Sequence, residues 1–123
     1  MKFAFLIMGD FNIEVDRATI HDGMARIVGV ASIGEAKEEA LRLEREGVGC
    51  IELCGAFGED GARAIIEATG NRIPVGYVTH FPEQDEVYRT ACRGEHLYPT
   101  HIMECIHSRF EHEFNSTECT RQC

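Results

Sequence analysis

The sequence lacks any cluster of basic side chains. It contains 12 Lys and Arg residues against 21 Asp and Glu residues, which gives a formal net charge of −9. Binding to the phosphate backbone of a nucleic acid needs several convergent Lys or Arg side chains, and an anionic membrane surface attracts the same groups. The composition therefore argues against a nucleic-acid partner and against attachment to an acidic membrane.

Long apolar runs are also missing. No stretch approaches the roughly 20 apolar residues that a membrane-spanning helix needs. The apolar run from Phe3 to Met8 ends at Gly9-Asp10, and no small-residue cleavage site of a signal peptide follows it. We therefore expect a cytoplasmic protein without a membrane partner, in which the six cysteines stay reduced.

The distribution of cysteine and histidine changes near residue 90. Four of the six cysteines and four of the six histidines follow that point. This shift predicts a single α/β domain at 1–90 and a Cys/His-rich tail at 91–123, partly helical or poorly ordered. The apolar spacing over 100–114 favours an amphipathic helix. His101 and Cys105 fall on its other side, but their surroundings match no standard zinc module, so we expect neither a metal site nor a cofactor.

Four apolar segments, at 2–9, 26–31, 48–54 and 73–79, are typical of β-strands. Helical patterns follow the second and third of them, over 32–46 and 59–69. Strands that alternate with helices indicate parallel β–α–β units, and an open, mainly parallel four-stranded sheet with helices packed on it is the expected fold. The continuous apolar runs further suggest strands covered on both faces.

The connections carry their own signals. Ser32 and Glu35 have the spacing of a capping box at a helix start. In the helix that follows, the periodicity places Glu39 among the residues that face water. Between the first two strands, Asp16 could cap a short helix that runs to His21 and ends at Gly23.

The turn at 54–61 joins the end of a strand to the start of a helix. In open α/β sheets ligands bind at this edge, and glycines let the backbone approach a ligand closely. Gly55, Ala56, Phe57 and Gly58, together with Asp10 after the first strand, are the candidate ligand-binding residues. The spacing matches neither a dinucleotide fingerprint nor a phosphate-binding loop, and a tight turn that needs glycine for its dihedral angles is the alternative.

Glu52, Cys54 and His80 are the candidate catalytic residues. A carboxylate on a strand buried on both faces is costly unless it is paired, which makes Glu52 a functional candidate. Cys54 near a helix start could be a nucleophile, and His80 after a strand could transfer protons. The alternatives are a solvated Glu52, a buried inert Cys54 and a solvated loop His80. Cys50 and Cys54 cannot pair, because four residues of strand separate them by roughly 13 Å.

Several segments resemble a known family. They are MKFAFLIMGDF at 1–11, IVGV at 27–30, GVGCIELCGAFGEDGARAIIEATGN at 47–71 and IPVGYVTHFPEQD at 73–85. Together they resemble small prokaryotic proteins catalogued as a domain of unknown function, with IELCGAFG and IPVGYV as the most specific motifs. The resemblance spans residues 1–90. It implies a compact α/β fold and brings no established activity.

Three functions remain open on the sequence, and the weakest of them is a thiol or metal sensor built from the Cys/His-rich tail. The first is the binding of a small, anionic or carbonyl-bearing metabolite at the carboxyl edge of the sheet, with enzymatic activity through Glu52 or His80. The second is a non-catalytic, homo-oligomeric interaction module, because a small sheet leaves edges and an apolar face to be covered.

Overall fold

The structure, a computed structural model, describes residues 1–92. The tail predicted for 91–123 therefore lies outside the described residues, apart from its first two. The chain divides into two compact units, Met1–Val78 and a second unit that begins at Thr79. The domain boundary expected near residue 90 stays a prediction.

The first unit is built on one five-stranded sheet. Its strands are β1 (Lys2–Met8), β2 (Arg17–Ile20), β3 (Ala25–Val30), β4 (Val48–Leu53) and β5 (Val75–Tyr77), in the order β2-β3-β1-β4-β5. β1, β3, β4 and β5 run parallel, and only β2 is antiparallel to its neighbour. The predicted α/β fold with an open, mainly parallel sheet is confirmed, with one strand more than expected.

The additional strand replaces the short helix expected at 16–21, and that prediction is wrong. Residues 17–20 form β2, which pairs with β3 through a tight hairpin. His21, Asp22 and Gly23 all have positive φ in its turn. The Asp16 carboxylate accepts a hydrogen bond from the Asn12 amide at 2.7 Å, so it closes the preceding loop instead of capping a helix.

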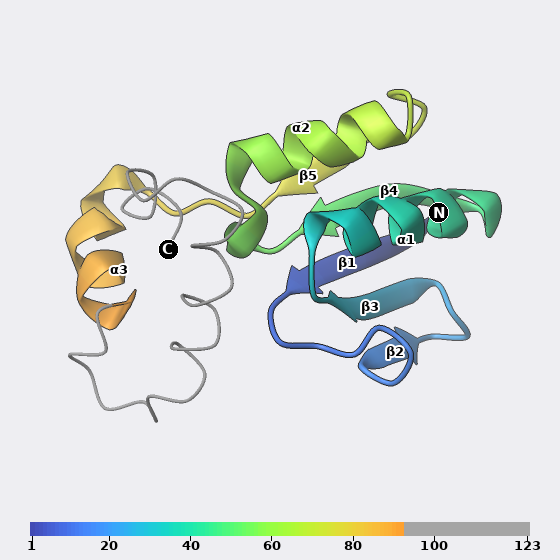
Figure 1. The fold of residues 1–123 in the computed structure, drawn as a ribbon, viewed down its shortest axis with the longest axis horizontal. Helices are drawn as coiled ribbons and strands as arrows, with labels where there is room; N and C mark the ends of the chain where they lie inside the picture. Colours follow the sequence, from blue (N-terminus) through green and yellow to red (C-terminus); the bar gives the residue numbers. More distant parts are fainter. Residues whose placement is uncertain (93–123) are drawn as a thin grey trace. The chain divides into compact units, whose positions relative to one another are not determined.

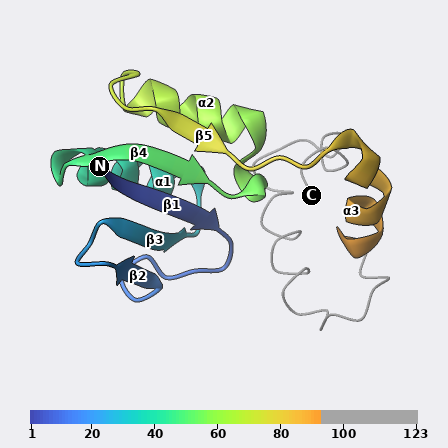
Figure 2. The same ribbon diagram turned by 180° about the vertical axis from the view of Figure 1, so that it is seen from behind.

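Two helices cover one face of this sheet. They are α1 (Ile33–Arg45), between β3 and β4, and α2 (Gly58–Ala68), between β4 and β5. Both lie on the same side, as the two opposite views in Figures 1 and 2 show. The capping box at the start of α1 is confirmed: the Ser32 hydroxyl accepts from the Glu35 amide at 3.2 Å, and the Glu35 carboxylate accepts from the Ala31 amide at 2.7 Å.

The core lies between the helices and that one face. Alternate strand residues point into it, and they pack against apolar residues of α1 and α2. The buried residues are Ala4, Leu6, Met8, Val28, Val30, Ile51 and Leu53 from the sheet and Ala36, Ala40, Leu43, Ala62 and Ile65 from the helices. The intervening residues of β1 point the other way, and Phe3 is 37% exposed. The expectation that the strands are covered on both faces is therefore wrong.

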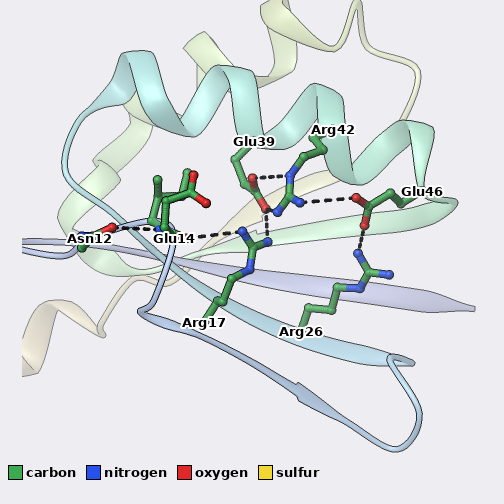
Figure 3. A network of polar contacts seen from close by, with 8 residues as sticks. Asn12, Glu14, Arg17, Arg26, Glu39, Arg42 and Glu46 are labelled. Atoms are coloured by element: carbon green, nitrogen blue, oxygen red, sulfur yellow. Dashed lines mark hydrogen bonds and ion pairs between the residues drawn. The ribbon is translucent and has the colours of Figure 1, made fainter.

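The helix also buries a carboxylate that the periodicity assigned to solvent. Glu39 is only 3% exposed. Its Oε1 accepts a hydrogen bond from the Arg17 guanidinium of β2 at 2.8 Å, and its Oε2 accepts from Arg42 Nε at 2.8 Å (Figure 3). Burial raises the pKa of the Glu39 carboxyl, while the charge of Arg17 opposes that rise. A buried carboxylate is tolerated here because two guanidinium groups hold it.

Arg17 also donates to the Ile13 carbonyl of the loop before β2, at 3.3 Å. The same network ties the β2–β3 hairpin to the end of α1 at one further point. Arg26 of β3 forms an ion pair with Glu46, which follows α1 and also accepts from Arg42 at 3.5 Å. Figure 3 shows the carboxylates on the helix side and Arg17 and Arg26 reaching toward them from the sheet.

We predict that Glu39→Ala destabilises the protein by about 1–3 kcal/mol, because Arg17 and Arg42 lose their buried acceptor. The matched control is Glu38→Ala, one residue away and exposed, which should change the free energy of unfolding by less than about 0.5 kcal/mol. Urea denaturation of both variants measures the difference. Equal losses in the two variants would contradict the structural role of this network.

Candidate functional site

The carboxyl ends of β1 and β4 meet where the sequence places its candidate site. The Met8 amide donates a hydrogen bond to Cys54 Sγ at 3.3 Å, and the Cys54 amide donates to the Leu6 carbonyl at 2.9 Å. Cys54 therefore lies directly beside the end of β1. Asp10 follows that strand by two residues and is exposed.

The glycine-containing turn has mainly structural duties. A 3₁₀ turn (Gly55–Phe57) leads into α2, and Gly58 has φ 58° and ψ −169°. This region of backbone space is essentially restricted to glycine. Phe57 is 3% exposed and belongs to the core. A Cβ at Gly61 would lie 3.0 Å from Phe57 Cβ and 3.3 Å from Ile33 Cδ1, so this glycine allows α2 to pack closely on α1.

These roles divide the predicted ligand-binding residues into two groups. Phe57 and Gly58 are buried, whereas Gly55 and Ala56 are partly exposed and Asp10 is exposed. Gly58 has the dihedral angles that favour glycine, as expected if this segment is a tight structural turn. Ligand binding by Asp10, Gly55 and Ala56 stays a prediction.

We predict that Gly58→Ala lowers the free energy of unfolding by about 1–3 kcal/mol, because alanine avoids this backbone conformation. Gly55→Ala is the matched control in the same turn. Its Cβ would meet only the Val78 carbonyl oxygen, at an ordinary 3.6 Å, so the change should stay within about 0.5 kcal/mol. Urea denaturation checks both values. If Gly55→Ala proved the more damaging, the assignment of roles in this turn would be wrong.

Carboxylates lie in the first turns of both helices that begin near this edge. Glu35 lies in the first turn of α1, and Glu59 and Asp60 lie in the first turn of α2. Their carboxylates already stabilise the positive ends of the helix dipoles and would repel a second negative charge. The capping box also occupies amides at the start of α1. The binding of an anionic metabolite at this edge stays a prediction.

Glu52 lies on the face of the sheet opposite the helices. It pairs in register with Phe5 of β1 and Gly76 of β5. A Cβ at Gly76 would lie 2.5 Å from Glu52 Oε2, so the carboxylate rests on this glycine. The Cys50 thiol donates to Glu52 Oε1 at 3.6 Å. Glu52 is partly exposed, so the premise that it is enclosed on both sides is wrong.

The environment of Cys50 keeps its thiol protonated. Burial raises the pKa of the Cys50 thiol, and the hydrogen bond to Glu52 and the negative charge of that carboxylate raise it further. A thiolate is the reactive form of cysteine. Cys50 is therefore a weak nucleophile near neutral pH.

We predict that alkylation of Cys50 in dilute native protein requires a higher pH than alkylation of the same residue in urea, because less thiolate is present at a given pH. Glu52→Gln should shift the native profile to lower pH, since it removes the repelling charge while burial remains. Glu59→Gln, which changes an exposed carboxylate elsewhere, is the control. The measurement is the rate of iodoacetamide labelling of the Cys50 peptide by mass spectrometry. An identical profile in wild type and Glu52→Gln would contradict the role of this carboxylate.

His80 belongs to the second unit, of which residues 79–92 are described. A 3₁₀ turn (Pro82–Gln84) and α3 (Asp85–Cys92) follow it. Its Nε2 lies 2.8 Å from Asp85 Oδ1, and its ring stacks on Tyr88 with centroids 3.9 Å apart and planes inclined by 13°. The imidazole is held in place by a carboxylate and an aromatic ring. A joint role with Glu52 and Cys54 stays a prediction.

One face of the sheet is not covered by any helix of Met1–Val78. An uncovered apolar face was expected from the sequence, but the residues on it were not predicted. We call it the open face. Figure 2 views the sheet from this side. The pairing registers place Ala18, Ile20, Ala25, Ile27, Phe3, Phe5, Ile7, Cys50 and Glu52 on it. Ile20 is 56% exposed and Ile27 is 36% exposed.

The loop between β1 and β2 limits the open face at one end. A Cβ at Gly29 would lie 2.6 Å from the ring of Phe11, so this ring rests on β3 near the carboxyl edge. Glu52 rests on Gly76 at the β5 side. The remaining surface over β1, β2 and β3 is apolar, and Arg17 and Arg26 point to the helix side.

Comparison with known proteins identifies the family. Residues 1–92 match a family of unknown function, DUF6506. The chain belongs to this family. The match confirms the resemblance seen in the sequence, and both the carboxyl edge and the open face lie within the part that matches the family. No curated protein and no solved structure is similar enough to match.

The described residues contain neither a membrane-spanning helix nor a cluster of metal ligands. Among residues 1–92, no helix has the length and apolar character that crossing a membrane requires. Within the same residues, no three His, Cys, Asp or Glu side chains converge in a way that could hold a metal ion. His101 and Cys105, weighed as zinc ligands, lie outside the described residues.

Proposed function

We propose that this domain is a protein-interaction module whose binding surface is the open face of the sheet. The observation that carries the proposal is the concentration of apolar side chains on a face that no helix of Met1–Val78 covers. Phe3, Ile20 and Ile27 are each more than one-third exposed there. A contiguous apolar patch of this kind on a soluble domain marks an interaction surface.

The distribution of charge supports the proposal. Glu52 is the one formally charged side chain that the registers of β1 to β4 place on this face, and it lies toward β5. On the opposite face of β2 and β3, Arg17 and Arg26 are neutralised by Glu39 and Glu46. An apolar centre with a polar group at its margin is the usual composition of an interface between proteins.

The contacts of Cys50, Cys54 and Phe57 point the same way. The Cys50 thiol is stabilised in its protonated form, Cys54 Sγ accepts a hydrogen bond from the Met8 amide, and Phe57 is part of the core. Association through the open face uses the most exposed apolar residues of the sheet, whereas metabolite binding at the carboxyl edge leaves them unexplained.

The test uses Cys50 as a reporter, because it lies next to Phe3 in register on the open face. Cells that contain the chain at its native level are labelled with a membrane-permeant maleimide, and the labelling of Cys50 is compared with that of purified protein at nanomolar concentration and the same pH. We expect Cys50 to be labelled at least about fivefold more slowly in cells, because a partner covers it.

Cys54 is the internal control, since it lies past the end of β4, at the carboxyl edge beside Met8. Its labelling should be equal in cells and in dilute protein. If Cys50 were labelled at the same rate in both settings, the open face would be uncovered in the cell and the proposed function would be wrong.

A further inference from the structure

The size of the open face indicates what kind of partner can cover it. Five strands about 4.8 Å apart, with up to about six residues at about 3.3 Å each, span about 24 by 20 Å, on the order of 500 Å² in projection. A single helix is about 10–12 Å wide with its side chains and would leave about half of this width uncovered. A second sheet has matching dimensions and packs about 10 Å away, face to face.

The open face is also chemically suited to an identical surface. Its centre, over β1 and β3, consists of Phe3, Phe5 and Ile27, and Ile20 extends it over β2. Its registers place no basic group on it that would select an acidic partner, and its single carboxylate, Glu52, lies on β4 between Phe5 and Gly76. Apolar side chains that alternate with small residues, such as Ala18 and Ala25, can interdigitate with a copy of themselves.

Residues 93–123 of the same chain are an alternative cover for the open face, and the extent of the family match argues against them. The match ends at residue 92, so residues 93–123 are not part of what the family shares. The open face, in contrast, lies wholly within the shared part. Residues 93–123 therefore do not account for an apolar face that belongs to the family domain, whereas a second copy of that domain could cover it.

We infer that the partner is a second copy of this chain, stacked sheet against sheet in a symmetric dimer centred on Phe3, Phe5 and Ile27. The inference rests on the proposed function and names its partner. Two open faces together bury on the order of 1,000 Å² in projection. This lies just below the range for stable specific protein interfaces, which begins at about 1,200 Å², and the dimer should therefore dissociate on dilution.

The test is the mass of the purified full-length chain as a function of concentration, measured by sedimentation equilibrium from nanomolar to about 0.5 mM. We expect twice the 13.8-kDa monomer mass at the high end. Ile27→Lys places a charge at the centre of the interface and should weaken the dimer at least about 100-fold, because burying an unpaired ammonium group costs several kcal/mol.

Val15→Lys is the matched control. Val15 is 70% exposed and lies in the loop before β2, outside the open face, so this change should leave the dissociation constant unaltered. Circular dichroism of dilute protein establishes that Ile27→Lys folds. If it does not fold, Ile20→Lys on the edge strand β2 replaces it, because that side chain is already 56% exposed.

Two results would overturn the inference. One is a wild-type chain that stays monomeric up to 0.5 mM, and the other is a dimer that the open-face substitutions weaken no more than Val15→Lys does. A monomeric purified chain combined with slow Cys50 labelling in cells would mean that the open face binds a different protein. The proposed function as an interaction module would then be retained, and the inference that the partner is a second copy of this chain would be wrong. Unprotected Cys50 in cells would instead remove the proposed function itself.

Discussion

The handedness of the two crossover connections determines the layout of the first unit. β3 leads through α1 to β4, and β4 leads through α2 to β5, so the chain moves across the sheet in the same direction both times. A right-handed crossover places its helix on a side fixed by that direction. Both helices therefore lie on one face (Figures 1 and 2). The connection from β1 to β3 is a loop and a hairpin, and it supplies no helix for the other face.

This arrangement departs from the usual distribution of residues on a sheet with one covered face, because the uncovered face is also largely apolar. The ion pairs of Arg17 and Arg26 lie on the helix-covered side, where β2 and β3 extend to the margin of α1. Glu39 is buried there because these strands bring cations to it. The uncovered side has Phe3, Phe5 and Ile27 at its centre. A sheet that faced only water on that side would carry polar side chains at these positions.

Local signals in the sequence were sufficient for the elements whose stability is local. The capping box of Ser32 and Glu35 and the β–α–β unit from β4 to β5 were predictable because their determinants are a few residues apart. The hairpin that contains β2 had a signal that was overlooked. Asp22-Gly23 between two short β-prone segments is a hairpin turn, and Arg17 to Ile20 alternate between the two faces.

The remaining features depend on contacts between distant residues. Glu39 lies on the polar side of its helix by periodicity, and its burial is tolerable because Arg17, 22 residues away, joins the neighbouring Arg42 in holding the carboxylate. The apolar run of β1 could not reveal whether one face or both were covered, because apolar residues occupy both faces in either case. The positions of Phe57 and Gly61 in the core between α1 and α2 likewise follow from helix packing, which a turn motif does not encode.

The glycine turn is explained by contacts inside the domain, whereas the open face is not. Each glycine of the turn with an assigned role is explained by a contact or a dihedral angle inside the domain: Gly58 by its backbone conformation and Gly61 by the approach of two helices. Phe3, Ile20 and Ile27 have no such explanation within Met1–Val78, because exposed aromatic and branched side chains lower solubility without adding to the core. A surface of that composition gains its stabilisation only when another surface removes it from water. The open face is thus the part of this domain whose composition is explained by contact with another molecule.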